Sequence, residues 1–292
     1  MNIKLNQLIS WINSALSESV EYSEPLVDTV IKAEKYSLMA GGKRLRPILA
    51  LLFCEACGKE SEAFINVASA IEMIHTFSLI HDDLPCMDND DYRRGKLSCH
   101  KMYGEAQALL AGDSLVFLAF ETVCKEAENG VISDKTATEI IELLARSSGA
   151  FGMIGGQIID IESENKDIPI GTLRELQQKK TGALISAACE MGCILADAHH
   201  MIPFAKEYAE NLGLAFQITD DILDVRGSFD TLGKPIGSDQ KNNKTTFVSV
   251  YGIDKAELVA SELTDKAVKC LDSFKNTDCL KDLTYKLLKR EK

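Results

Sequence analysis

Residues 74–91 of the chain read IHTFSLIHDDLPCMDNDD. The stretch begins as an apolar run with helical spacing and ends with five aspartates among ten residues. Asp82 and Asp83 are adjacent, so their side chains diverge by about 100° on a helix. Pro85 disfavours helical geometry in the residue before it. We therefore predict that the helix stops or kinks there and that Asp88 returns on a loop.

This acidic cluster has the composition of a cation site. Carboxylates hold hard cations, and Mg²⁺ prefers a couple of carboxylates together with substrate phosphates and water. Arg93 and Arg94 follow closely, and guanidinium groups suit phosphate oxygens. The alternative is a solvated acidic helix end. His81, beside the two aspartates, is interpreted as a partner of the carboxylates, with direct metal binding as the less favoured alternative.

A second cluster, DDILD, occupies residues 220–224. It places Asp220 and Asp224 at positions i and i+4 on one helix face, where like charges repel. Without a cation this face lowers stability, and it interrupts an otherwise apolar run. Two such clusters in one chain favour a site for metal and diphosphate over two solvated acidic surfaces.

Composition excludes other classes of protein. The 292 residues are 46% hydrophobic and 26% charged, enough for a large core. A net charge of -12 argues against a nucleic-acid-binding protein, which needs a basic surface. We find no signal-peptide core in residues 1–18 and no apolar run of membrane-spanning length. Nine cysteines without a disulfide framework predict a reduced cytoplasmic protein. Cys54, Cys57, Cys189 and Cys193 are interpreted as core residues.

Helical spacing of apolar residues predicts one all-α domain over residues 1–292. We expect helices over residues 10–19, 25–39, 47–58, 62–84, 105–129, 133–147 and 183–198, from Pro203 to the second cluster, and again from Lys255. Thr172, with Glu175 three residues later, predicts a helix N-cap. Residues 226–246 lack periodicity, and long loops of this kind are often lids or binding segments. No convincing β alternation is found.

With both clusters in hand, the chain resembles the trans-isoprenyl diphosphate synthases, also called polyprenyl synthetases. The resemblance runs from Gly41 to Phe247 and includes both aspartate motifs, their basic neighbours and their order. The four residues between Asp83 and Asp88 match the spacing of bacterial farnesyl and plant-type geranylgeranyl members. The resemblance implies a single-domain bundle of long helices around a deep central cavity, usually a homodimer.

The resemblance also implies the roles of individual residues. Asp82, Asp88 and Asp220, assisted by Asp83 and Asp224, would bind typically three Mg²⁺ ions at the diphosphate of an allylic substrate, with Mn²⁺ possible, and Asp221 completes the catalytic set. The positions that match contacts to the allylic substrate are Arg93, Lys180, Thr181, Gln217 and Lys234, with Lys244 as a second lysine nearby. The positions that match the pocket for isopentenyl diphosphate are Lys43, Arg46, His75 and Arg94.

These residue types fit an ionisation–condensation–elimination reaction. Metal ions, Lys and Arg stabilise the departing diphosphate, and apolar walls keep the allylic cation from water. Isopentenyl diphosphate then attacks C1, and loss of a proton forms the new double bond. No protein nucleophile is needed, and in this family the departing diphosphate is the expected base.

Phe77, with Ser78, lies one to two turns before Asp82, about 7.5 Å along the helix in the case of Phe77. In this family a bulky aromatic residue there resembles a floor that stops chain growth at fifteen carbons. Phe77 is alternatively an ordinary core residue. We expect farnesyl diphosphate as product, with geranylgeranyl diphosphate next and geranyl diphosphate third.

Three rival functions remain open at this stage. A class I terpene cyclase has a different second metal motif and needs no second diphosphate site. An HD-type metal phosphohydrolase, suggested by His75 and the His81-Asp82 pair, leaves the second aspartate cluster and Lys180 unexplained. A non-catalytic partner subunit often lacks one aspartate motif, whereas both are intact here.

Overall fold

A computed structural model describes residues 3–226 and 245–288. The described chain is all-α except for one two-stranded hairpin, which confirms the predicted class. It divides into two compact units, residues 1–51 with 60–141 and residues 52–59 with 142–292. The predicted single domain around a central cavity stays a prediction.

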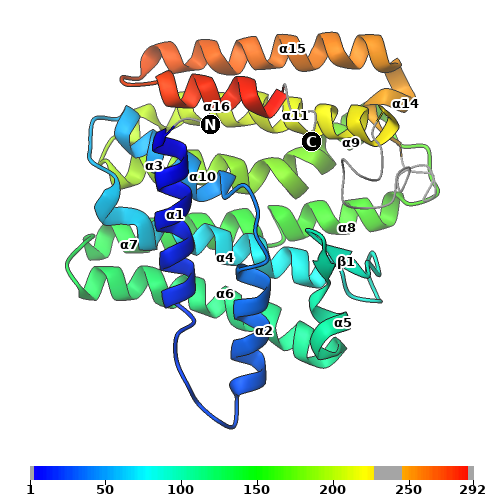
Figure 1. Ribbon diagram of the computed structural model, residues 1–292. Helices are drawn as coiled ribbons and strands as arrows, with labels where there is room; N and C mark the ends of the chain where they lie inside the picture. Colours follow the sequence, from blue (N-terminus) through cyan, green and yellow to red (C-terminus); the bar gives the residue numbers. More distant parts are fainter. Residues whose placement is uncertain (1–2, 227–244, 289–292) are drawn as a thin grey trace. The chain divides into compact units, whose positions relative to one another are not determined.

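The first unit is built on the pair α4 (Ile65–Asp82) and α6 (Glu105–Glu128), which lie side by side (Figure 1). α4 is apolar on every side, with Ile71, Met73 and Ile74 fully buried, as expected of a central helix. The other elements of this unit are α1 (Ile3–Glu18), α2 (Asp28–Leu38), the single turn η1 (Glu62–Phe64), β1 (Tyr92–Arg93), β2 (Lys96–Leu97) and α5 (Cys99–Tyr103). Two helices have residues in both units: α3 (Leu45–Ala56) and α7 (Asp134–Ser148).

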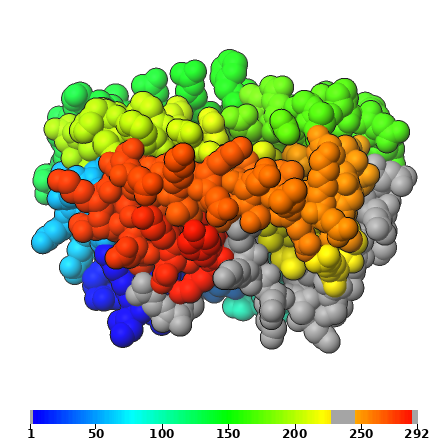
Figure 2. Space-filling view, turned by 90° about the horizontal axis from the view of Figure 1, so that it is seen from above, coloured from blue at the N-terminus to red at the C-terminus, as the bar shows by residue number. Residues whose placement is uncertain are grey.

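The second unit is built on α10 (Ala183–Leu195), α11 (Ile202–Arg226) and α15 (Ile253–Cys270). Its other elements are α8 (Met153–Ser163), α9 (Ile170–Gln177), the π-helical turn η2 (Gln178–Gly182), η3 (His199–Met201), α14 (Phe247–Tyr251), η4 (Leu271–Ser273) and α16 (Asp278–Leu288). α15 and α16 pack together and cover one surface of this unit (Figure 2). α15 is amphipathic, with Ala256, Ala260 and Ala267 buried beneath a charged outer face.

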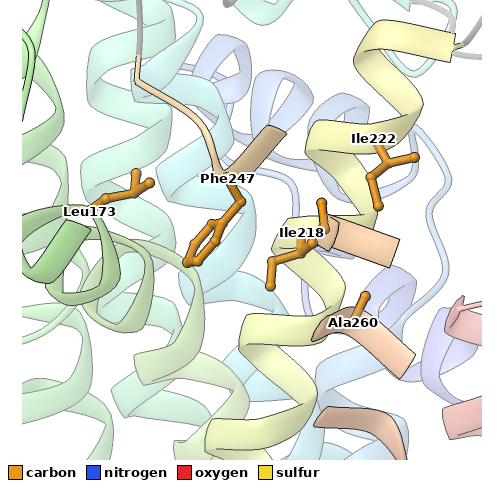
Figure 3. Close-up of a cluster of buried hydrophobic side chains, with 6 residues drawn as sticks. Leu173, Ile218, Ile222, Phe247 and Ala260 are labelled. Carbon is orange, nitrogen blue, oxygen red and sulfur yellow. The ribbon is translucent and has the colours of Figure 1, made fainter. Parts of the chain in front are cut away.

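Phe247, the first residue of α14, anchors the chain in the second unit. Its ring is 1% exposed and points between Leu173 of α9 and Ile218 of α11 (Figure 3). The Thr246 side chain and the Ser249 side chain form a capping box at the start of α14. This cluster therefore holds α9, α11, α14 and α15 together.

Most predicted helices are confirmed to within a few residues, and two details were wrong. α9 begins at Ile170 with Pro169 as its N-cap, so Thr172 lies inside the helix. The stretch predicted as a loop after Asp88 contains the β1–β2 hairpin, in which Arg94 and Gly95 form the turn at positive φ. Two helical spans also reach the length and hydropathy of a membrane-spanning helix, Glu62–Asp82 and Glu105–Glu128. Glu62–Asp82 lies largely buried in the core of the first unit, and neither span is clear evidence of a membrane-spanning helix.

Candidate active site

The first aspartate motif lies where α4 ends. Asp82 is the last residue of the helix and Asp83 caps it, as Pro85 predicted. The backbone N–H of Asp88 then donates to the Asp82 carbonyl over 2.8 Å, so the turn doubles back on the helix end. Asp83 is 2% exposed, Asp82 is half-buried and Asp88 is exposed. The adjacent aspartates thus face different surroundings, as their divergence on the helix predicted.

Arg93 of the β1–β2 hairpin holds Asp83. Its Nε donates to both carboxylate oxygens over 2.9 and 3.2 Å, its Nη2 donates to the same carboxylate, and Nη2 also donates to Asp90 over 3.2 Å. Burial raises the pKa of the Asp83 carboxyl, although Arg93 opposes that rise. The charge of Asp83 is therefore balanced by a guanidinium group, and the ion pair fixes the hairpin to the helix end.

Arg44 is a structural residue rather than an anion ligand. It is 2% exposed, and its guanidinium donates to Asn13 over 2.8 Å, to Glu72 over 3.0 Å and to the Leu38 carbonyl over 2.5 Å. These hydrogen bonds use Arg44, at the start of α3, to join that helix to α1, α2 and α4. Lys43, one residue before it, is exposed.

Arg46, Arg94 and His75 form a cationic cluster around the buried carboxylate of Glu72. Burial lowers the pKa of Arg46 to about 10, while Glu72 acts to raise it and Arg94 to lower it. Burial and the nearby Arg46 and Arg94 hold the pKa of His75 well below its usual value, so the imidazole is neutral at pH 7. Within the described residues, Arg46 Nε is buried without a hydrogen-bond partner. Because Arg44 already holds the Glu72 carboxylate, the charges of Arg46 and Arg94 suit an added anion.

Two glycines make room for Arg94. Gly42 has φ +122°, and a Cβ there would lie 2.6 Å from Arg94 Cζ. Arg94 also donates to the carbonyl of Gly41. Only glycine permits both this backbone conformation and the close approach of the guanidinium. The Gly41-Gly42 break predicted between helices therefore also positions a cationic site residue.

The residues predicted to control chain length lie one turn or more before the aspartates. Phe77 is 8% exposed and packs edge-to-face on His81, with ring centroids 5.2 Å apart. The Ser78 hydroxyl donates to the His75 carbonyl over 2.8 Å. His81 does not bond the aspartates as expected. Its Nε2 lies 3.0 Å from the Leu109 carbonyl of α6.

In the second unit, Lys180 and Thr181 lie on the π-helical turn η2. Lys180 Nζ donates to Asp160 of α8 over 2.7 Å. Thr181 Oγ1 donates to Gln217 Oε1 over 3.2 Å. Gly156 of α8 allows this approach, because a Cβ there would lie 2.2 Å from the Lys180 backbone nitrogen. Lys180, Thr181 and Gln217 thus lie in one region of the second unit, and their contact with an allylic diphosphate stays a prediction.

The second aspartate motif lies near the C-terminal end of α11. Asp221 is 5% exposed and accepts from the Phe247 backbone N–H over 2.9 Å and from Gln217 Nε2 over 3.5 Å. Asp220 is half-buried and Asp224 is 8% exposed. In the described part of the chain, Asp224 Oδ1 is buried without a hydrogen-bond partner. A buried carboxylate oxygen in this condition fits a cation.

Residues 3–226 and 245–288 contain no group of three or more His, Cys, Asp or Glu side chains placed to hold a metal ion on its own. This agrees with the chemistry of Mg²⁺, which completes its coordination with water and substrate phosphate. The orphaned oxygen of Asp224 and the exposed carboxylate of Asp88 fit such ligation. Lys234 and Lys244 lie outside the described residues.

Sequence reasoning missed Glu72, Asp160 and Gly112 as parts of these arrangements. Glu72 is the lone acid within the apolar run of α4. Such an acid indicates a buried carboxylate that pairs with a cation. Asp160 stands in a Gly- and Ile-rich stretch, where the sequence does not indicate its contact with Lys180. Gly112 offered no signal, because the need for a glycine there arises from His81 on another helix.

Comparison with known proteins agrees with this geometry. Residues 27–285 match the polyprenyl synthetase family. The chain is 44% identical over 255 residues to a farnesyl diphosphate synthase of Geobacillus stearothermophilus, covering 87% of this chain and 85% of the relative. It is 43% identical over 265 residues to the chloroplastic geranylgeranyl pyrophosphate synthase of Capsicum annuum, covering 90% and 71%.

The fold also resembles a crystal structure of an FPP/GFPP synthase from Zymomonas mobilis, with TM-score 0.86, 38% identity and 97% of each chain covered. The chain therefore belongs to the polyprenyl synthetase family and is a prenyltransferase that joins prenyl units head to tail.

Proposed function

We propose that the protein condenses isopentenyl diphosphate with dimethylallyl and then geranyl diphosphate to give (E,E)-farnesyl diphosphate. The observation that carries this proposal is the pair Arg46 and Arg94 beside the carboxylate of Glu72, which Arg44 already holds. It supplies an anion site beyond the metal-binding aspartates, as a reaction between two diphosphates requires. A terpene cyclase or a phosphohydrolase has no such need.

The cationic cluster binds isopentenyl diphosphate. Arg46 and Arg94 balance the diphosphate charge, with Lys43 at the exposed side. Neutral His75 adds a hydrogen bond to this pocket without further positive charge. The guanidiniums hold the nucleophilic substrate so that its double bond reaches C1 of the allylic substrate.

By resemblance, Arg93, Lys180, Thr181 and Gln217 are ligands of the allylic diphosphate in this proposal. Arg93 lies at the first motif, and Lys180, Thr181 and Gln217 lie around η2 and α11. The resemblance to the family adds Lys234 and Lys244 as further ligands of the allylic diphosphate. These cations and donors act where negative charge develops as the carbon–oxygen bond breaks. The departing diphosphate then accepts the proton whose loss forms the new double bond.

Membership of the family implies a divalent metal, typically Mg²⁺. We propose Asp82, Asp83 and Asp88 in one motif and Asp220 and Asp224 in the other as ligands of three ions, with Mn²⁺ as a substitute. When bound, the metal supplies electrostatic stabilisation of the leaving diphosphate. Asp221 acts differently, because its bonds to Phe247 and Gln217 position α14 and the side chain of Gln217.

Phe77 limits the product to fifteen carbons in this proposal. Both named relatives are consistent with the chemistry, but one makes farnesyl and the other geranylgeranyl diphosphate by name. The aromatic side chain at Phe77 favours the shorter product. Geranylgeranyl diphosphate is the alternative product.

We also propose a cytoplasmic homodimer. In the first unit, α6 exposes Leu109, Leu110 and Phe117 by 44, 58 and 72%. In the second unit, Phe151, Ile154, Ile158 and Ile161 form an exposed stripe at helical spacing, by 82, 50, 51 and 40%. Apolar surfaces of this kind mark interaction sites. Isologous association of two copies through the α6 surface would cover it. Sedimentation at micromolar concentration tests this, and Phe117→Glu should yield monomer.

The activity is tested by incubating the protein with isopentenyl diphosphate, Mg²⁺ and dimethylallyl or geranyl diphosphate. A dominant fifteen-carbon diphosphate is expected, and Phe77→Ala should lengthen it. A twenty-carbon product from the unaltered protein would keep the condensation but remove Phe77 as the floor. Hydrocarbon release from farnesyl diphosphate alone would indicate a cyclase, and absence of condensation by folded protein would contradict the proposal.

A further inference from the structure

The His81 side chain points away from the aspartates beside it and is held by α6. Its Nε2 lies 3.0 Å from the Leu109 carbonyl and 3.7 Å from Asp113 Oδ1. Because a carbonyl oxygen only accepts hydrogen bonds, Nε2 carries the proton and donates it to Leu109. His81 thus links the last turn of α4, which presents Asp82, to the neighbouring helix.

Gly112 of α6 provides the space for this ring. A Cβ at Gly112 would lie 2.3 Å from His81 Nε2 and 2.4 Å from Cδ2, far inside van der Waals contact. Gly112 lies within α6 and its φ is not in the left-handed region. Helix propensity alone would therefore favour alanine at this position. The glycine is explained by the imidazole that fills its place.

The same imidazole supports Phe77. The two rings meet edge-to-face, with an interplanar angle of 88° and centroids 5.2 Å apart, one turn from each other on α4. Phe77 is 8% exposed, so its ring is packed rather than free to change rotamer. Three positions on two helices thus form a series of contacts: Gly112 admits His81, and His81 packs on Phe77.

We propose that Gly112 and His81 are positioning residues for chain-length control. Gly112 seats the imidazole against α6, and the imidazole holds the Phe77 ring in the orientation that blocks chain growth. The proposal rests on the proposed function, in which Phe77 limits the product. It assigns His81 neither metal binding nor proton transfer.

The seating of His81 is tested by a double-mutant cycle in thermal unfolding of Gly112→Ala, His81→Ala and the double variant. Gly112→Ala should lower Tm by several degrees, because the methyl group displaces the ring. In the His81→Ala background the same change should leave Tm unchanged or raise it, because the clash is gone. The matched control is Gly171→Ala in α9, where a Cβ meets nothing within 4 Å and Tm should not fall.

The positioning role is tested by product length, which a merely structural role would not move. Gly112→Ala and His81→Ala should each raise the share of products longer than fifteen carbons several-fold, toward the distribution of Phe77→Ala. Gly171→Ala should keep the original distribution. The Michaelis constant for isopentenyl diphosphate should change less than the product ratio in Gly112→Ala, since the glycine is remote from the cationic cluster in sequence and contacts.

Each outcome tests either the seating of His81 against α6 or its role in chain-length control. If Gly112→Ala raises Tm as a helix-favouring change should, or lowers it equally with and without His81, the seating is wrong. If the cycle shows the expected coupling but product length is unaltered while Phe77→Ala lengthens it, the role in chain-length control is wrong. If Phe77→Ala itself leaves the product unchanged, the proposed floor fails, and the coupling in Tm still stands or falls on its own.

Discussion

The two aspartate motifs hold their carboxylates in different ways. In the first motif, the buried carboxylate of Asp83 is balanced by the guanidinium of Arg93, within the same unit. In the second motif, Asp221 accepts from a backbone N–H, whereas one oxygen of Asp224 is buried without a partner among the described residues. Similar sequences thus give one motif with its own counter-ion and one whose buried charge fits an added cation.

The difference follows from position in the fold. The first motif lies at a helix end, where a hairpin can bring an arginine to it. The second lies in the last two turns of the 25-residue helix α11, where helical geometry fixes the spacing of its carboxylates. A buried carboxylate needs hydrogen bonds or a cation because loss of hydration is unfavourable. We therefore expect the second motif to depend more on metal and substrate than the first.

Asp83→Ala should give the largest loss of stability among these variants, together with a loss of activity. It leaves Arg93 in a largely buried place without its bidentate partner, and removal of one member of such a pair lowers unfolding free energy by about 3–5 kcal/mol. Activity should fall with it, because the hairpin that carries Arg93 and Arg94 loses its attachment. Urea unfolding and steady-state kinetics measure the two losses. Unchanged stability would show that Arg93 is held by Asp90 instead.

Asp224→Asn should separate activity from stability. The change removes a buried charge, so stability without metal should be unchanged or higher by about 1 kcal/mol. Activity should fall about 10²–10³-fold, the usual effect of losing one electrostatic contact to the transition state. The contrast with Asp83→Ala is the sharpest test of the comparison. A loss of stability in metal-free Asp224→Asn would mean that this carboxylate also has an internal counter-ion.

Metal removal should leave part of diphosphate binding intact. Inorganic pyrophosphate in EDTA should stabilise the protein through Arg46 and Arg94, by about 1–3 kcal/mol at concentrations well above its dissociation constant. Arg46→Gln should abolish this stabilisation, whereas Asp224→Asn should keep it. Addition of Mg²⁺ should increase stabilisation in the wild type and less in Asp224→Asn. The comparison is given by thermal shifts of the wild type, Arg46→Gln and Asp224→Asn with pyrophosphate, first in EDTA and then in Mg²⁺.

Glu34 supplies the smallest effect and a control from outside both motifs. It is 1% exposed, Oε1 has no partner in the described chain, and burial raises its pKa despite hydrogen bonds from Ser114 and Tyr22. A carboxyl whose folded pKa is raised adds stability below its unfolded pKa, and this is lost as pH rises through the folded pKa. The stability of Glu34→Gln relative to that of the wild type should therefore be higher at pH 7 than near pH 4. An equal difference at both pH values would contradict the raised pKa.

Sequence reasoning predicted the elements that depend on nearby residues. Pro85 ended α4 as expected, and the i, i+4 pair Asp220 and Asp224 lies on α11. It misplaced the start of α9, because Pro169 precedes the Thr172 signal and serves as the cap. It also missed the short β1–β2 hairpin, since two-residue strands carry no detectable alternation. It did not predict the contacts within the protein that Lys180 makes with Asp160 and Thr181 with Gln217.

The sequence by itself determined the helices, the two acidic motifs with their basic neighbours, and the family to which they point. These follow from periodicity, proline and charge, which act over a few residues. Only the tertiary structure decided which of the cations is structural, as Arg44 is, and which has a buried N–H without a partner among the described residues, as Arg46 does. It alone showed that Arg93 neutralises Asp83 and that Gly112 makes room for His81. The physical reason is that burial and pairing join residues distant along the chain, and only packing specifies which atoms meet.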